Sequence, residues 1–207
     1  MFKDRVEAGI NLASALPQAE FDIVIVVAKG GIPVGKQISN ILKIPLKVTV
    51  VRKIPIPGNP EAGMGAVDET GYLILNHRLI AELGLRETEI QKSINSVKRE
   101  IARRASFFRD WLKSGSLDGL KVILTDDGLA SGYTMLAAIK SVRGAKASQV
   151  TVAVPTTHFR AKQLVALNAD KFVSLIVETK EFFAGADYYE HWKDLTDKEA
   201  MDYLEDD

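Results

Sequence analysis

The chain has 207 residues, of which 46% are hydrophobic and 26% are charged, a composition typical of a globular protein large enough to bury a core. Its 27 basic and 27 acidic side chains balance, so no overall charge would attract a nucleic acid or an acidic membrane surface. The absence of cysteine excludes disulfides, thiolate metal sites and a thiol nucleophile. No apolar run approaches the length of a membrane span, and the first residues do not resemble a secretion signal, so we expect a cytoplasmic protein.

The first part of the chain alternates predicted helices with predicted strands. Apolar residues three and four positions apart indicate amphipathic helices, whereas short continuous β-branched runs are typical of strands buried on both faces of a parallel sheet. In chain order, these patterns predict a helix that ends at Pro17, a strand over 21–28, a helix over 33–42 with Pro33 in its first turn, a strand over 46–51, a loop rich in proline and glycine over 52–67, and a weaker strand over 72–75.

The longest periodic segment is a predicted amphipathic helix from Thr88 to about Lys113. Thr88 and Gln91 have the spacing of a capping box at its start. The apolar stripe that would face the core comprises Ile90, Ile94, Val97, Ile101, Ala105, Phe108 and Trp111.

The same segment carries a strip of basic side chains. Acidic residues share it, so we expect a solvated face or a subunit contact in preference to a nucleic-acid surface. The basic residues are Lys98, Arg99, Arg103, Arg104 and Arg109, and the acidic ones are Glu87, Glu89, Glu100 and Asp110.

The last part of the chain continues the alternation of strands and helices. The predicted elements are a strand over 121–125, a helix over 134–144, a strand over 149–155, a helix over 158–169, a strand over 172–177, and a closing helix that begins with a capping box formed by Thr196 and Glu199.

This order of elements predicts one α/β domain over residues 1–207. A mostly parallel central sheet would be flanked by helices on both faces, and residues 71–113 would form a largely helical insertion, or hood. In such sheets ligands bind at the carboxyl ends of the strands, where the strand order changes direction. The segments that follow the predicted strands are therefore where a site is expected.

Two adjacent acidic residues, Asp126 and Asp127, follow the strand over 121–125. A single carboxylate at a strand end is often an ordinary helix cap. Two together disfavour joint ionisation unless a polar or cationic group faces them. A sugar diol fits this requirement, because each of two neighbouring hydroxyls can donate to a carboxylate.

The loop after these aspartates favours a phosphate. Small residues at Ala130, Ser131 and Gly132 allow successive backbone amides to converge, and the helix that begins near Thr134 brings its partly positive end to the same place. The hydroxyls of Ser131 and Thr134 would add donors. Carboxylates for a diol beside amides for a phosphate predict a site for a ribose 5-phosphate.

The stretch "VILTDDGLASGYT" resembles the signature of type I phosphoribosyltransferases. Receiver domains also place paired acids at a strand end, but near the chain start and without this phosphate loop. Gly128 and Tyr133 depart from the residues more common in the signature, at positions that vary. The matching residues are Asp126, Asp127, Ala130, Ser131, Gly132 and Thr134.

The resemblance implies an enzyme that binds phosphoribosyl pyrophosphate with Mg²⁺ and transfers ribose 5-phosphate to a nitrogen atom, releasing pyrophosphate. Asp126 and Asp127 would hold the ribose hydroxyls and contribute to the magnesium site, and Asp127 would be placed to act as a base toward the acceptor. The implied loop for the 5-phosphate comprises Gly128, Leu129, Ala130, Ser131, Gly132, Tyr133 and Thr134.

The resemblance also implies a pyrophosphate site. Lys29, Gly30 and Gly31 follow the strand over 21–28 and match the loop that holds pyrophosphate; "AKGG" alone is more typical of a plain strand-to-helix turn, and the downstream motif in the same chain reverses this preference. Arg52 and Lys53 would face the leaving group, with the alternative of a solvated surface pair. "RK", "GNPE", which contains Glu61, and "GAV" together resemble a bacterial and archaeal branch of the family.

The tail "EFFAGADYYEHWKDL" resembles the end of 6-oxopurine phosphoribosyltransferases, where an aromatic residue lines the base site and a nearby acid assists magnesium. Phe182 or Phe183 and Asp187 would take these roles; the alternative is that the aromatic residues belong to the core.

We therefore expect a magnesium-dependent phosphoribosyltransferase of nucleotide metabolism that acts on a nitrogen acceptor such as a nucleobase. A non-catalytic regulator that senses phosphoribosyl pyrophosphate is the main alternative, and a hydrolase using the same site is a third. We further expect a homodimer, with neither a membrane nor a nucleic acid as a partner.

Overall fold

The computed structural model describes residues 1–17, 20–113 and 115–206. Its central sheet has five strands in the order β2-β1-β6-β7-β8, and every neighbouring pair is parallel. The expected parallel sheet is confirmed, although β7 extends three residues beyond its predicted end. The strands are β2 (Leu46–Thr49), β1 (Ile23–Val27), β6 (Lys121–Thr125), β7 (Gln149–His158) and β8 (Lys171–Glu178).

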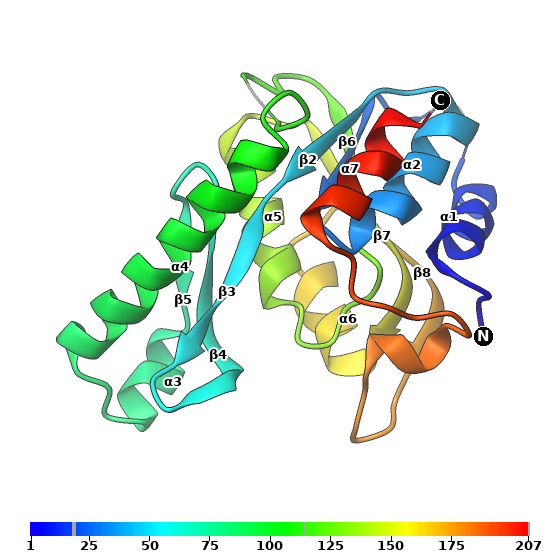
Figure 1. Ribbon diagram of the computed structural model, residues 1–207. Helices are drawn as coiled ribbons and strands as arrows, with labels where there is room; N and C mark the ends of the chain where they lie inside the picture. The colour runs from blue at the N-terminus through cyan, green and yellow to red at the C-terminus, as the bar shows by residue number, and fades with distance from the viewer. Residues whose placement is uncertain (18–19, 114, 207) are drawn as a thin grey trace.

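Helices cover both faces of this sheet because its strands are apolar on both sides. On one face, Val24 and Val26 share a core cluster with α1 (Arg5–Ser14), α2 (Gly31–Leu42) and α7 (Asp197–Glu205). On the other face, Ile25 and Val27 pack with α5 (Tyr133–Gly144) and α6 (Phe159–Ala166). Alternate residues of β1 therefore hold the two helical layers (Figure 1).

The strand order changes direction between β1 and β6. The chain runs from β1 outward to β2, and then returns to place β6 on the other side of β1. In the register of this pair Val26 lies opposite Thr125, so both strands end at the same level. The segments that follow them, 28–31 and 126–134, consequently meet at the switch point, where sheets of this kind bind ligands.

A second, antiparallel sheet stands beside the first. It contains β3 (Val51–Ile56), β4 (Asn59–Asp68) and β5 (Leu73–Leu75), followed by α3 (His77–Glu82) and the long helix α4 (Glu87–Phe107). Figure 1 shows these elements together at one side of the central sheet. We call β3, β4, β5, α3 and α4 the arm.

The prediction of a long loop over 52–67 was wrong, because these residues form the β3–β4 hairpin. Two of its three glycines, Gly63 and Gly65, are places of close approach between strands. A Cβ on Gly65 would lie 2.2 Å from the carbonyl oxygen of Ile74 on β5, and one on Gly63 would lie 2.5 Å from Cγ of Lys53 on β3. Glycine in a strand often marks such an approach, and composition alone does not distinguish it from a loop.

Both predicted ends of the long helix were wrong. The helix begins one residue earlier, and the amide of Arg86 donates to Oε2 of Glu89 at 3.0 Å, so the predicted pair of Thr88 and Gln91 does not form the cap. It ends at Phe107, and the chain then pairs with the edge of β2: the Val48 amide donates to the Trp111 carbonyl at 2.7 Å. An edge strand thus gains hydrogen bonds from residues assigned to the helix.

Several smaller elements complete the fold. The sequence patterns did not predict α3 or the short 3₁₀ helix η1 (Gly185–Tyr188). The predicted capping box of the closing helix is confirmed, since the Thr196 hydroxyl accepts from the Glu199 amide at 3.1 Å and the Thr196 amide donates to Glu199 Oε2 at 2.7 Å. Over the described ranges, no helix is both long enough and apolar enough to cross a bilayer.

Candidate functional site

The aspartate pair packs directly against the loop that follows β1. A Cβ on Gly30 would lie 2.2 Å from Oδ2 of Asp127, and one on Gly31 would lie 2.8 Å from the Cα of Asp126. Only glycine allows this contact, so "AKGG" is specific to its partner and is more than a plain turn. The peptide between Ala28 and Lys29 in this loop is cis. The structure therefore brings two of the segments chosen from sequence into contact.

Asp126 is a carboxylate whose ionisation is opposed by its surroundings. Burial raises its pKa well above the ordinary range, and the negative charge of Asp127 raises it further. Its Oδ1 accepts a hydrogen bond from the Asp127 amide at 2.9 Å, and the residue lines a cavity of about 470 Å³. A cation or hydroxyl donors arriving in this cavity would favour the ionised form.

Asp127 is held by residues from both ends of the chain. Nε of Arg5 donates to Asp127 Oδ2 at 2.9 Å, and the hydroxyl of Tyr189 donates to the Asp127 backbone carbonyl at 2.6 Å. Burial raises the pKa of Asp127, while the charge and the hydrogen bond of Arg5 oppose this rise. Asp127 thus forms an ion pair with Arg5, whereas no ion pair of Asp126 is found among the residues that the structure describes.

Arg5 itself is a buried and well-satisfied residue. Its guanidinium lies 3.7 Å from the centre of the Trp192 ring and donates to the Lys193 carbonyl at 2.9 Å. The sequence analysis missed Arg5, Tyr189 and Trp192 as members of the site. No local pattern could have identified them, because Arg5 and Asp127 are 122 positions apart.

The predicted phosphate loop offers a row of backbone donors. Within the described ranges, the amides of residues 130–135 donate to no protein acceptor. Gly132 caps α5 with a φ of +80°, a conformation that favours glycine, and Ala130 and Ser131 are exposed. These amides, together with the partly positive end of α5, form a place for an anion.

Three residues of the predicted loop have contacts with other parts of the protein. Leu129 is buried, and its amide and carbonyl bond to Thr156 and His158 of β7, so it anchors the loop to the sheet. Tyr133 accepts a hydrogen bond from Nδ2 of Asn76 at 2.9 Å and so ties the loop to the arm. A Cβ on Gly128 would lie 3.1 Å from the Thr156 side chain, which makes Gly128 a packing position as well.

The arm brings the two predicted cations to the aspartate side. Arg52 and Lys53 of β3 line the same 470 Å³ cavity as Asp126 and Thr134, and so does Ala28 next to Lys29. Arg52 forms an ion pair with Glu100 of α4, in which its Nη2 lies 2.8 Å from Oε1. The Glu61 side chain, the remaining prediction for this loop, lies outside the described residues.

The C-terminal segment passes close to the loop. Phe183 is half-buried and stacks on Tyr188 with 5.5 Å between ring centres, whereas Phe182 is 87% exposed and belongs to no core. Asp187 is exposed on η1, and no hydrogen bond or ion pair joins it to the aspartate pair in the part of the chain that the structure describes. The Cα of Gly185 would lie 3.8 Å from a Cβ on Gly128.

The site residues fit a magnesium ion that is held largely by its substrate. The described residues contain no group of three or more side chains able to ligate a metal. Mg²⁺ commonly takes one or two carboxylates and completes its shell with water and phosphate oxygens. Asp126 suits this role, because it lines the cavity and, in the described part of the chain, forms no ion pair like that between Arg5 and Asp127.

The fold is that of type I phosphoribosyltransferases: a parallel sheet flanked by helices, with paired acids and a loop of small residues after the strand at its switch point. Residues 5–191 match the model of the phosphoribosyl transferase domain family. The chain therefore belongs to the phosphoribosyl transferase domain family, and the resemblance found in its sequence is confirmed.

Individual relatives agree with this assignment. A protein of Mycobacterium tuberculosis named "Putative phosphoribosyl transferase" is 32% identical over 207 residues, which cover 99% of this chain and 46% of that protein. The chain thus spans about half the length of this relative. The protein TT1426 from Thermus thermophilus has a similar structure, with 31% identity, a TM-score of 0.80, and coverage of 98% of this chain and 97% of that one. AQ2163 from Aquifex aeolicus shares the fold at 11% identity and a TM-score of 0.53, covering 84% and 74% of the two chains.

Proposed function

We propose that this chain transfers ribose 5-phosphate from phosphoribosyl pyrophosphate to a nitrogen acceptor, with a nucleobase as the expected acceptor class, and releases pyrophosphate. One observation carries the proposal. The largely enclosed aspartate pair, the unpaired amides of residues 130–135 and the cations of β3 converge on the carboxyl ends of β1 and β6. These groups match the diol, the phosphate and the pyrophosphate of one substrate.

In the proposed binding mode, the amides of 130–135 and the hydroxyls of Ser131 and Thr134 hold the 5-phosphate. Asp126 accepts from a ribose hydroxyl, while Asp127 is kept in place by Arg5 and contributes its remaining oxygen. The Lys29–Gly31 loop and the cations Arg52 and Lys53 face the pyrophosphate. Phe183, which stacks on Tyr188, would form one wall for an acceptor base.

Positioning and electrostatics would then carry the reaction. As the bond between the sugar and pyrophosphate lengthens, negative charge grows on the leaving group, and Arg52 and Lys53 stabilise it. The electron-poor ribose is captured by the acceptor nitrogen, and Asp127 is placed near enough to take the proton that this nitrogen loses. When bound, magnesium would neutralise phosphate charge. No covalent intermediate with the protein is required.

Binding of phosphoribosyl pyrophosphate tests the donor half of the proposal. Replacing Asp126 and Asp127 by Asn should weaken its affinity at least tenfold, because the amides remove the charges that the diol and magnesium require. Calorimetry with phosphoribosyl pyrophosphate and magnesium measures this change. Unchanged affinity in the double variant would sink the proposed binding mode.

A panel of acceptors tests the transfer itself. The protein is incubated with phosphoribosyl pyrophosphate, magnesium and purines, pyrimidines or small nitrogen compounds, while released pyrophosphate and nucleotide mass are followed. We expect both products with at least one acceptor. Tight binding without release across the panel would identify a sensor, and pyrophosphate release without an acceptor would identify a hydrolase.

A further inference from the structure

One arginine of α4 is buried at the cavity, contrary to the expectation of a solvated basic strip. Arg104 is only 8% exposed, whereas Arg99 and Arg103 on the same helix are exposed. It lines the 470 Å³ cavity together with Arg52 and Lys53 of β3. The arm therefore presents three cations to the space beside Asp126, one more than the sequence patterns predicted.

The guanidinium of Arg104 is poorly satisfied for a buried group. Its Nη2 lies 3.8 Å from Oε1 of Glu100 and its Nε lies 3.4 Å from Oδ1 of Asp197, both longer than a hydrogen bond. Its side chain makes no hydrogen bond to any residue that the structure describes, and its buried Nε has an ion-pair partner in Asp197 but no hydrogen-bond acceptor. Buried donors in native proteins nearly always have acceptors. The donors of Arg104 therefore indicate a ligand that supplies hydrogen-bond acceptors.

The charges around Arg104 indicate the sign of that ligand. Oε1 of Glu100 faces both Arg104 and Arg52, so two guanidinium groups share one carboxylate oxygen. Burial and then the charge of Arg104 lower the pKa of Arg52. Basic residues outnumber acidic ones along the cavity, where Arg52, Lys53 and Arg104 face Glu100 and Asp126. A bound anion would relieve the repulsion and complete the hydrogen bonds.

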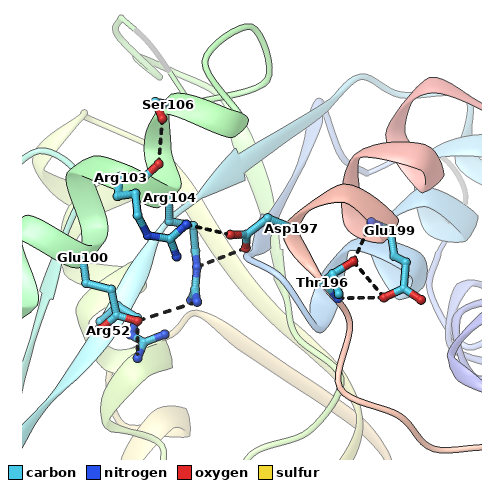
Figure 2. A network of polar contacts seen from close by, with 8 residues as sticks. All are labelled: Arg52, Glu100, Arg103, Arg104, Ser106, Thr196, Asp197 and Glu199. Atoms are coloured by element: carbon cyan, nitrogen blue, oxygen red, sulfur yellow. Dashed lines mark hydrogen bonds and ion pairs between the residues drawn. The ribbon is translucent and has the colours of Figure 1, made fainter.

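A residue from the C-terminal helix holds Arg104 in this position. Asp197, the first residue of α7, places Oδ1 near Arg104 and Oδ2 at 3.3 Å from Nη1 of Arg103, and its side chain is only 14% exposed. Figure 2 shows the carboxylates of Glu100 and Asp197 reaching Arg104 from α4 and α7. The position of Asp197 is fixed, because the capping box of Thr196 and Glu199 holds the start of α7.

We propose that Arg104 is a further binding residue of this site, which contacts the pyrophosphate group of the substrate, and that Asp197 is its positioning residue. This inference rests on the proposed function, since it assigns a group of the same substrate. Pyrophosphate oxygens would supply the acceptors that Arg104 lacks and would bring it together with Arg52 on one leaving group. A guanidinium suits this role because its planar donors match phosphate oxygens in pairs.

Binding of pyrophosphate and magnesium, measured by calorimetry, tests the assignment without any acceptor. We expect Arg104→Gln to weaken the affinity for pyrophosphate at least tenfold and Arg104→Lys to restore part of it. Arg99→Gln is the matched control: it removes the same charge from the same helix at an exposed position outside the cavity, and its affinity should stay within twofold. Asp197→Asn should weaken binding by less than Arg104→Gln.

The outcomes separate this inference from the proposed function. Equal affinities in Arg104→Gln and Arg99→Gln, with a wild-type protein that binds phosphoribosyl pyrophosphate, would overturn the role of Arg104 and leave the function standing. A wild-type protein that binds neither compound would overturn both. Thermal unfolding checks each variant; if Arg104→Gln does not fold, the decision passes to Arg104→Lys and Asp197→Asn, and wild-type affinity in both would refute the assignment.

Discussion

Asp126 illustrates a conflict between stability and binding at a single residue. It lies largely enclosed beside a like charge at the end of β6, and both conditions raise its pKa. Ionised Asp126 therefore destabilises the protein in the absence of a ligand. Such a cost is expected at a binding site, where the ligand supplies the missing hydrogen-bond donors.

Asp126→Asn should stabilise the free protein at neutral pH. A carboxyl whose pKa is raised in the folded state contributes fully to stability below its unfolded pKa, near 3.8, and loses that contribution as the pH rises through the folded pKa. The variant has no such loss, and its Oδ1 can still accept from the Asp127 amide. In magnesium-free buffer, its melting temperature should exceed the wild-type value by a few degrees at pH 7, and by less near pH 4. A lower melting temperature at pH 7 would contradict this view of Asp126.

Arg5 stabilises the folded protein, whereas ionised Asp126 destabilises it. Arg5→Met would leave Asp127 largely buried without its cation, and breaking a buried pair in this way costs about 3 kcal/mol of unfolding free energy. Urea unfolding measures the loss. Adding Asp127→Asn to Arg5→Met should recover much of it, because no unpaired charge remains. If the double variant is no more stable than Arg5→Met, the pairing of Arg5 with Asp127 is not what the substitution disrupts.

Local signals at the residue scale reached one part of the site. The aspartate pair and the amide loop lie in one short segment at a strand end, so a local sequence motif was enough to predict their chemistry. Arg5, Tyr189 and Arg104 gave no such signal, because each acquires its role from a residue far away in sequence. An arginine in an amphipathic helix looks the same whether it faces water or a cavity.

At the scale of elements, helix caps show where sequence patterns succeed and fail. Two candidate capping boxes had the correct spacing, but only that of Thr196 and Glu199 forms. At the other, Arg86 precedes the helix and Thr88 lies inside its first turn, where it is exposed. The spacing of the two residues is the same in both pairs. Whether the threonine lies at the N-cap position depends on where the preceding chain enters the helix.

Matched threonine substitutions test this difference. Thr196→Ala should lower the free energy of unfolding by about 1 kcal/mol, because the Glu199 amide loses its acceptor. Thr88→Ala should change it by less than about 0.5 kcal/mol, since alanine is a good helix former at an exposed position. Urea denaturation measures both. Equal losses would show that the cap geometry at Thr196 does not stabilise α7.

The same scale explains the error in the arm. Alternating burial in β3 and β4 was obscured by prolines and glycines that are typical of loops, although Gly63 and Gly65 serve close contacts between strands. The buried parallel strands were easier to predict, because a continuous β-branched run between turns has few other interpretations.

At the scale of the whole molecule, the alternation of strands and helices predicted the sheet and its binding edge. It did not predict that the arm and α7 would meet over the cavity, since no local pattern states which helix another will touch. That meeting joins β3, α4 and α7 through Glu100 and Asp197, so this side of the cavity is built from three separate parts of the chain.

The contacts of Arg5 and Tyr189 with Asp127 also affect the order in which parts of the protein can fold during synthesis. A growing chain contains both aspartates and the whole amide loop once residue 135 has been made, but Tyr189 and Trp192 come more than fifty residues later. Until they arrive, Arg5 lacks the aromatic and carbonyl contacts that orient it. Contacts between residues far apart in the sequence thus form late, and a nascent chain completes the surroundings of Asp127 only after Trp192 and Lys193 have been made.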